Sequence, residues 1–188
     1  MVPRGKLDLA ALLLLQAFLV PLSNPYRGKL REGPGFIRLD GSRHRELPAP
    51  ADARRDADRA VRDLESAIAS GAALLEPEET ANDIEFGLSA AHLFMDGNGR
   101  LARAVGNWVL LRAGYQLVND PKRYCRERIH AYYFSLAAGE AGDRTRFREF
   151  FAGLVASCYR VPQPSEADRR DRDSGAQRPH TPVAWSNG

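Results

Sequence analysis

The sequence predicts a mostly α-helical fold, a compact bundle of helices that carries one short β-hairpin. Two observations lead to this fold class. Apolar residues recur at helical spacing in several segments, and Pro, Gly or Asp stand at the ends of those segments. One Asp-Gly dipeptide lies between short apolar runs, a pattern that is typical of a hairpin turn.

The length of the chain fits a single domain followed by a tail. The 188 residues are 44% hydrophobic and 27% charged, which is ordinary for a globular protein with a buried core. From residue 161 onward Pro, Arg, Asp, Ser and Gly dominate, so we expect a disordered polar tail over 161–188. The folded domain is therefore expected over residues 1–160.

The net charge argues against a nucleic-acid partner, and the cysteine content argues against a cysteine metal site or a disulfide framework. The net charge of +3 is small, and the arginines alternate with acidic residues, so no nucleic-acid partner is expected. Cys125 and Cys158 have no metal-ligand spacing, and two cysteines do not make a disulfide framework in a chain of this length. We therefore expect a reducing, cytoplasmic setting.

The most apolar segment covers residues 7–20. It is too short to span a bilayer, so no membrane partner is expected. Arg4 and Lys6 precede it, as in a signal peptide, but Asp8 and Gln16 interrupt the run and no small-x-small cleavage site follows. The pattern favours a buried core helix, and secretion through a signal peptide stays open as the alternative.

Residues 33–47 predict the hairpin. Phe36 and Ile37 precede the Asp40-Gly41 turn dipeptide, and His44 lies on the returning strand. An ordinary surface hairpin is the alternative to a functional one. Pro48 and Pro50 then break the chain.

Two helices are expected between the hairpin and residue 94. Residues 51–70 form the first, which Gly71 ends, and residues 76–94 contain the second, with Pro77 in its first turn and its end at His92. The expected buried positions are Ala57, Val61, Leu64 and Ile68 in the first helix, and Ile84, Leu88 and Ala91 in the second.

Three more helices are expected after the second one. They cover residues 100–113, with Gly114 as a C-cap, then residues 120–138, and finally a helix capped by Asp143. The expected buried residues are Leu101, Val105, Trp108, Leu110 or Leu111, then Ile129, Tyr132 or Tyr133, Leu136, and last Phe147, Phe150, Phe151, Leu154 and Val155.

A turn with the chemistry of an anion site lies between two of these helices. Gly97 and Gly99 allow backbone N–H groups to converge on one point, and the following helix adds its free N–H groups and its dipole. Arg100 and Arg103 share one face of that helix and suit the outer phosphates of a nucleotide. The segment therefore predicts a phosphate-binding turn.

Two further side chains in this segment suit catalysis. His92, at the end of the preceding helix, can act as a base on an incoming hydroxyl, and Asp96 can hold a magnesium ion that bridges phosphates. Each feature alone fits a helix cap, a solvated arginine pair or a structural histidine. The order of all of them is far more specific.

This segment resembles the signature of the Fic family, H-x-F-x-(D/E)-G-N-G-R-x-x-R. Leu93 stands where many members have Pro. The resemblance extends over about residues 7–159, at the level of pattern outside the motif, and it implies a compact Fic-type helical bundle with a hairpin flap. Every fixed position of the signature is matched, by His92, Phe94, Asp96, Gly97, Asn98, Gly99, Arg100 and Arg103.

The resemblance implies transfer of AMP from Mg-ATP to a Ser, Thr or Tyr hydroxyl of a target protein, with release of pyrophosphate. It makes His92 the base and Asp96 the ligand of Mg²⁺, with ATP as co-substrate. The cofactor-binding residues that it implies are Gly97, Asn98, Gly99, Arg100 and Arg103. It also implies that the flap residues Phe36, Ile37 and Arg38 hold the target segment by strand addition.

Two other functional classes stay open. One is a transferase of UMP, phosphocholine or phosphate, and the other is a non-catalytic binding module. The related Doc branch, which phosphorylates its target, has Lys at the position of Gly99, so Gly99 favours nucleotidyl transfer. Nucleotide choice depends on pocket residues, and one of Tyr132 and Tyr133 is a candidate to approach the adenine.

The sequence contains no inhibitory pattern of the family, (S/T)-x-x-x-E-(G/N). The glutamate that precedes Gly33 has Gly28 four residues before it, and Glu149 is followed by Phe150. In the family this glutamate pairs with the arginine that Arg103 matches. We therefore expect either constitutive activity, as in secreted effectors, or a small separate antitoxin as inhibitory partner.

Overall fold

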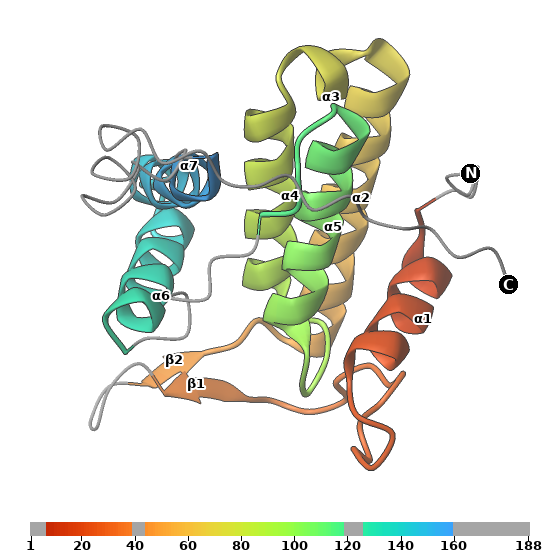
Figure 1. The fold of residues 1–188 in the computed structure, drawn as a ribbon. Coiled ribbons are helices and arrows are strands. Elements are labelled where there is room, and N and C mark those ends of the chain that lie inside the picture. The colour runs from red at the N-terminus through yellow and green to blue at the C-terminus, as the bar shows by residue number, and fades with distance from the viewer. Residues whose placement is uncertain (1–6, 39–43, 119–125, 160–188) are drawn as a thin grey trace, which may run out of the picture. The chain divides into compact units, whose positions relative to one another are not determined.

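The computed structural model describes residues 7–38, 44–118 and 126–159. In this part of the chain seven helices and one two-stranded antiparallel sheet are present (Figure 1). The described residues up to Cys158 belong to one compact unit. The elements are α1 (Leu9–Leu19), β1 (Phe36–Arg38), β2 (His44–Glu46), α2 (Pro50–Ser70), α3 (Ala72–Leu75), α4 (Pro77–Ala91), α5 (Asn98–Arg112), α6 (Arg126–Glu140) and α7 (Thr145–Tyr159).

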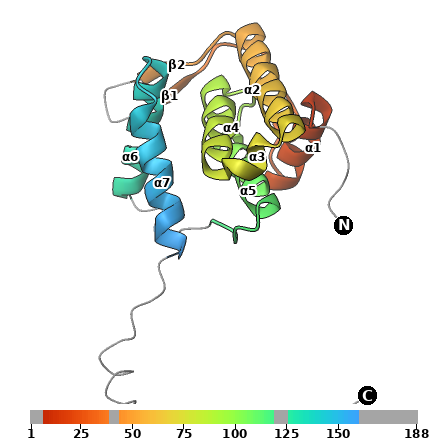
Figure 2. The same ribbon diagram turned by 90° about the horizontal axis from the view of Figure 1, so that it is seen from above.

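The main core surrounds α4 and α5. α2 packs against α4, and α1 packs against α5, so that α4 and α5 lie in the middle of the bundle (Figures 1 and 2). The side chains that fill this core come from α1, α2, α4, α5 and α7, and from the loops at Leu93, Phe94 and Val118. The largest fully buried ones are Phe94, Leu12, Leu101, Leu110 and Leu154.

A second cluster of buried side chains joins α4 to α6 and α7. It contains Phe86, Tyr132, Leu136 and Phe147. The rings of Phe86 and Phe147 meet edge to face with centroids 5.2 Å apart, a favourable arrangement of two aromatic quadrupoles. This aromatic cluster fixes α6 beside the carboxyl end of α4, where the motif begins.

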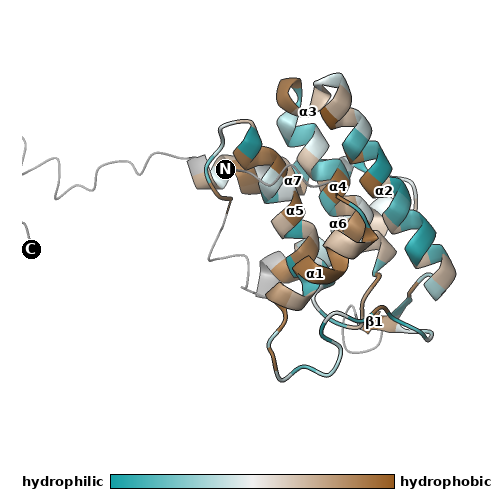
Figure 3. Ribbon diagram, turned by 90° about the vertical axis from the view of Figure 1, so that its right-hand side faces the viewer, coloured by the Kyte–Doolittle hydropathy of each residue, from teal (hydrophilic) through white to brown (hydrophobic). Residues whose placement is uncertain are grey.

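The predicted hydrophobic patterns are confirmed for most of the helices. α1 is apolar along its length, and the exposed side of α2 is hydrophilic (Figure 3). Leu12 of α1 is buried in the core, which confirms the expected core helix. No helix within 7–38, 44–118 or 126–159 has both the length and the apolar character needed to cross a membrane.

The hairpin is also confirmed, with Phe36 opposite Glu46, Ile37 opposite Arg45 and Arg38 opposite His44. Ile37 and Arg45 face the same side of the sheet, because directly opposite residues of an antiparallel pair share a face. The expected turn at Asp40-Gly41 lies outside the described residues.

Some details differ from the sequence predictions. Ile129, expected inside, is 39% exposed, and Leu110, not Leu111, is the buried member of its pair. The short helix α3 was not predicted. The expected tail at 161–188 lies outside the described residues, and so does the start of the helix predicted from residue 120.

The predicted end of the second helix at His92 is confirmed, because His92 is the C-cap of α4 and has a left-handed backbone with φ 50° and ψ 52°. That conformation stops α4 at Ala91 and turns the chain into the motif loop.

Candidate active site

The motif loop runs from His92 to Gly97 and is held in shape by Asn98. The side-chain oxygen of Asn98 accepts a hydrogen bond from the Phe94 N–H at 2.9 Å, and its amide donates to the Phe94 carbonyl at 2.7 Å. Phe94 is fully buried, as expected for a side chain that plugs the core. Both hydrogen-bonding groups of the Asn98 side chain are therefore used to hold the loop. The backbone N–H of Asn98 lies at the start of α5.

Gly97 is required where the loop passes α1. Its φ is +84°, a conformation that costs energy for any residue with a Cβ. A Cβ at this position would also lie 2.7 Å from Cγ2 of Val20, which is closer than real contacts allow. Both constraints explain why glycine precedes α5.

Two buried polar side chains that the sequence analysis did not single out hold the loop in place. Gln16 of α1 donates to the Asp96 carbonyl at 2.9 Å and accepts from the Gly28 N–H at 2.5 Å. Arg31 donates to three carbonyls, those of His92 at 3.2 Å, Gly33 at 2.7 Å and Pro48 at 2.5 Å. The position of Gln16, a polar residue inside the apolar run of α1, was the feature of the sequence that could have indicated this role.

A cavity of about 200 Å³ brings half of the predicted site residues together. The motif contributes His92, Asn98, Gly99 and Arg103, and the flap contributes Ile37. The other lining residues are Ser89 on α4 and Ile129, Tyr132, Tyr133 and Leu136 on α6. Both candidate tyrosines therefore lie at the cavity, and Ile129, expected in the core, lies there too.

The imidazole of His92 is set up as a neutral base. Burial lowers its pKa to about 4, with further lowering from the positive charges of Arg45 and Arg31. The backbone of Ser89 acts on this pKa in the opposite direction. Because the pKa lies far below 7, the ring is neutral at neutral pH and one of its nitrogens carries a lone pair.

The start of α5 offers free backbone N–H groups beside the cavity. The first N–H groups of a helix have no partner within it, and here they belong to Asn98, Gly99 and Arg100. The Arg103 guanidinium lies over Gly99, since a Cβ there would be 2.9 Å from Nη1 of Arg103. Among the described residues no carboxylate forms an ion pair with Arg103.

Asp96 and Arg100 form a separate pair beside α1. Nη2 of Arg100 donates to both carboxylate oxygens of Asp96 at 2.9 Å, and Nη1 donates to the Leu19 carbonyl at 3.0 Å. Asn24 donates to the same carboxylate at 2.8 Å. Neither Asp96 nor Arg100 lines the 200 Å³ cavity.

The residues present fit a magnesium ion that is held mainly by a nucleotide. The Asp96 side chain is 44% exposed, so its oxygens can be reached from solvent. Within the described residues no group of three or more His, Cys, Asp or Glu side chains could hold a metal. Mg²⁺ commonly uses one or two carboxylates, several waters and substrate phosphates, and a single Asp96 suits that mode.

Comparison with known proteins agrees with this geometry. A sequence model of the Fic/DOC family matches residues 6–110, more than half of the chain. The chain belongs to the Fic/DOC family. This confirms the resemblance drawn from the motif, and the match supports a transferase of the Fic type.

The curated relatives carry a more specific name. Protein adenylyltransferase Fic of Drosophila persimilis is 37% identical over 105 residues, which cover 56% of this chain and 19% of that protein. The same protein of Drosophila grimshawi is 40% identical over 78 residues, covering 42% and 15%. The chain thus spans about a fifth of the length of the first of these relatives.

Solved structures of Fic proteins share the fold. A Fic family protein from Desulfovibrio desulfuricans G20 has a TM-score of 0.63 at 22% identity, with 90% of this chain and 48% of that chain covered. Fic-1 from C. elegans has a TM-score of 0.58 at 19% identity, covering 91% and 46%. The predicted fold class, a Fic-type helical bundle with a hairpin, is therefore confirmed.

The hairpin of this Fic chain lies beside the cavity that the motif forms. Ile37 lines the cavity, whereas the Phe36 side chain is 65% exposed. Arg38 pairs with His44 through the backbone of the sheet, and its side chain is outside what the structure describes. A segment that adds to this hairpin would pass close to His92.

Proposed function

We propose that this Fic chain transfers AMP from Mg-ATP to a Ser, Thr or Tyr hydroxyl of a target protein. One observation carries the proposal: a neutral imidazole, the N-terminus of α5 and the Arg103 guanidinium share one cavity. A base for a hydroxyl and a site for phosphates are thereby adjacent. The names of the curated relatives support the choice of AMP, and Gly99 argues against the phosphorylating Doc type.

In the proposed reaction the hydroxyl oxygen forms a bond to the α-phosphorus of ATP. The bond from that phosphorus to the oxygen leading to the β-phosphate breaks, and pyrophosphate leaves. His92 takes the hydroxyl proton on its unprotonated ring nitrogen. Neutral His92 is ready for this step at physiological pH, because its pKa lies far below 7.

The phosphates would be held by the start of α5 and by Arg103. The free N–H groups of α5 and its positive dipole end stabilise the negative charge that develops on the transferred phosphate. Mg²⁺, when bound through Asp96, would supply positive charge to the outer phosphates. For Arg100 to contact a phosphate, its guanidinium must leave the bidentate pair with Asp96.

The target would bind at the hairpin, with Ile37 between it and the cavity. Tyr133 and Tyr132 line the opposite wall, where an adenine ring could stack on an aromatic face. Tyr132 already shares a hydrogen bond of 2.7 Å with Ser89. Tyr133 is therefore the better candidate for contact with the base.

A labelled-donor experiment tests the proposal. Purified chain is incubated with a cell lysate and ATP labelled either at the α- or at the γ-phosphate, beside labelled UTP and CDP-choline. We expect protein-bound label that depends on the added chain from α-labelled ATP alone, compared with lysate without the chain, and a mass increase of one AMP on a hydroxyl residue. If the chain transfers the γ-phosphate, UMP or phosphocholine instead, that group and not AMP is the one transferred. If the chain transfers no group from any donor, the binding module is favoured.

Regulation is part of the same proposal. No described carboxylate pairs with Arg103, so we propose that the nucleotide site of this chain is unobstructed, and that any inhibitory glutamate belongs to a separate small antitoxin. The purified chain should then bind ATP and transfer AMP without an activating mutation. Activity that appears only after one of its own glutamates is replaced would contradict this.

A further inference from the structure

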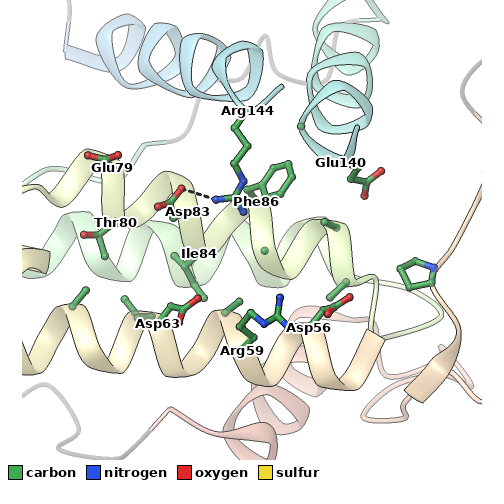
Figure 4. A pocket seen from close by; sticks show the side chains of 18 of the residues that line it. Asp56, Arg59, Asp63, Glu79, Thr80, Asp83, Ile84, Phe86, Glu140 and Arg144 are labelled. Carbon is green, nitrogen blue, oxygen red and sulfur yellow. Dashed lines mark hydrogen bonds and ion pairs between the residues drawn. The ribbon is translucent and has the colours of Figure 1, made fainter. Parts of the chain in front are cut away.

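A second and larger cavity lies over α2 and α4, beside the junction of α6 and α7 (Figure 4). Its volume is about 910 Å³, compared with about 200 Å³ for the catalytic cavity. One wall is a face of α2 between residues 56 and 67, and the next is a face of α4 between residues 79 and 91. Gly139, Glu140 and Arg144 close the third side. We call this cavity the acidic groove.

The acidic groove has the length and floor of a helix-binding site. Eleven helical steps along α2, from residue 56 to residue 67, correspond to about 16 Å, the length of a helix of roughly eleven residues. Small side chains on the floor allow another backbone to approach closely. They include Ala60, Ala67, Gly87 and Ala90, which are all partly exposed.

Charge defines what this groove can bind. Seven acidic residues and three arginines line it. Asp83 pairs with Arg144 at 3.4 Å, Glu79 pairs with Arg148 at 3.1 Å, and Glu140 pairs with Arg45. Within the described residues no ion pair joins the remaining lining carboxylates to another element; these are Glu46, Asp56, Asp63 and Glu76.

One guanidinium of the chain itself, that of Arg144, already lies in the groove. Arg144 reaches across it to Asp83, and its guanidinium carbon lies 4.3 Å from the centroid of the Phe86 ring (Figure 4). An aromatic face and a carboxylate together are a favourable site for arginine. Burial raises the pKa of Asp83, the positive charges of Arg144 and Arg148 lower it, and the nearby carboxylates of Glu79 and Asp63 raise it to a smaller extent.

The acidic groove adjoins both the hairpin and the catalytic cavity. Glu46, Leu47 and Pro48, at the end of the hairpin, line it. Arg45 lies between the two cavities, since it donates to the Ala90 carbonyl and to Glu140 on the groove side, while its charge acts on His92. A protein bound in the groove would therefore have the hairpin within immediate reach.

We propose that the acidic groove binds an arginine-rich amphipathic helix of the protein that is modified. This assignment of the occupant rests on the proposed transfer to a protein target. The apolar face of the helix lies on the small residues of the floor, and its arginines pair with Asp56 and Asp63 on the α2 rim. The groove then selects basic targets, and the hairpin presents their hydroxyl to His92.

A synthetic peptide tests the groove without any transfer. The probe is a fluorescent twelve-residue amphipathic helix with Leu on one face and Arg on the other, and its control has Glu in place of Arg. We expect the basic peptide to bind the full chain in low salt and the acidic peptide not to bind. Asp63→Lys should weaken binding by about fivefold or more, since it removes one ion pair and adds a repulsion.

The matched control is Asp58→Lys, which makes the same charge change on α2 at a position that does not line the groove. Its affinity for the basic peptide should stay within about twofold of the parent. Equal weakening by Asp58→Lys and Asp63→Lys would mean a general charge effect and would overturn the proposal. Failure of the basic peptide to bind the parent chain would overturn it as well.

Competition tests the occupant. Excess basic peptide should reduce AMP transfer to the target in a lysate while ATP binding stays unchanged, and the acidic peptide should leave transfer intact. If the basic peptide binds but does not compete, the target does not use the groove. If no transfer occurs at all, the proposed function fails, and the peptide affinities still decide whether the groove binds a basic helix.

Discussion

The motif residues fall into two groups that the fold treats differently. His92, Gly99 and Arg103 line the catalytic cavity, where the imidazole is neutral and no described carboxylate pairs with the arginine. Asp96 and Arg100 lie beside α1 and hold each other by two hydrogen bonds of 2.9 Å. In the proposed function the first group already has the arrangement that the reaction needs. The second group would have to exchange its internal partners for a nucleotide and a metal ion.

One short motif can therefore contain residues that the fold already holds in the cavity and residues that, in the proposed function, change partners when the nucleotide binds. The cavity residues are placed by helix ends, since His92 follows α4 and Gly99 and Arg103 belong to the start of α5. The Asp96–Arg100 pair is placed by side chains and carbonyls of the α1 region. The variants below separate these two contributions.

The largest effect is expected for His92→Ala in the cavity group. Transfer should fall roughly a hundredfold to ten-thousandfold, the usual range for a positioned general base. ATP affinity and the melting temperature should change little, because the loop is held by Asn98 and Arg31 rather than by the imidazole. Transfer at the parent rate would mean that His92 is structural.

A smaller loss is expected for Asp96→Ala in the second group. Removal of the carboxylate should reduce transfer by roughly tenfold to a hundredfold and raise the Mg²⁺ concentration needed for half-maximal rate. Asn24→Ala is the control, because it removes a partner of Asp96 and keeps the carboxylate. An unchanged magnesium titration of Asp96→Ala would exclude this residue from metal binding.

Gln16→Met tests how α1 anchors the loop. The substitution leaves the Asp96 carbonyl and the Gly28 N–H without their buried partner, which costs about 1–3 kcal/mol of unfolding free energy for each group. Leu14→Met is the control, since Leu14 is exposed on the same helix. Urea unfolding measures both variants, and equal stability of the two would show that Gln16 is dispensable.

The flap variants Ile37→Gly and Phe36→Gly test target docking. Both loosen the strand, so modification of a protein target should fall severalfold while ATP binding is kept. Ile37→Gly should have the larger effect, because Ile37 also lines the cavity. Parallel titrations with ATP and with target measure this, and equal losses in both would assign the hairpin a purely structural role.

The smallest change is expected from Arg45→Met, and it concerns pH. The positive charge of Arg45 helps to lower the pKa of His92, so its removal should raise that pKa from about 4 toward the ordinary value of a histidine. The acid limb of the pH–rate profile should then move to higher pH. Arg45→Lys keeps the charge and should keep the parent profile, and NMR titration of the imidazole gives the same quantity directly.

The low pKa of His92 also predicts the direction of a stability change. Between the ordinary pKa of histidine and a pKa of about 4, the unfolded chain binds a proton that the folded chain does not. Stability contributed by neutral His92 is therefore lost as pH falls through this window. In urea unfolding, His92→Ala should lose less stability than the parent chain between pH 6.5 and pH 4.

Much of the fold and the identity of the site could be predicted from the sequence, because they depend on local patterns. Helical periodicity gave α2, α4 and α5 with most of their buried hydrophobic residues, and the Asp-Gly dipeptide indicated the hairpin. The motif identified the family and the candidate catalytic residues, since spacing along the chain determines which groups lie at adjacent helix ends.

Only the tertiary structure decided which of these groups meet and what partners they have. Gln16 and Arg31 reach the loop across 80 and 61 residues of sequence, and no local pattern encodes such a contact. The low pKa of His92 arises from burial and from Arg45, which the hairpin brings to it. Burial, the effect of charges that are distant in the sequence, and the shape of a cavity all depend on tertiary packing. They therefore cannot be read from local sequence patterns.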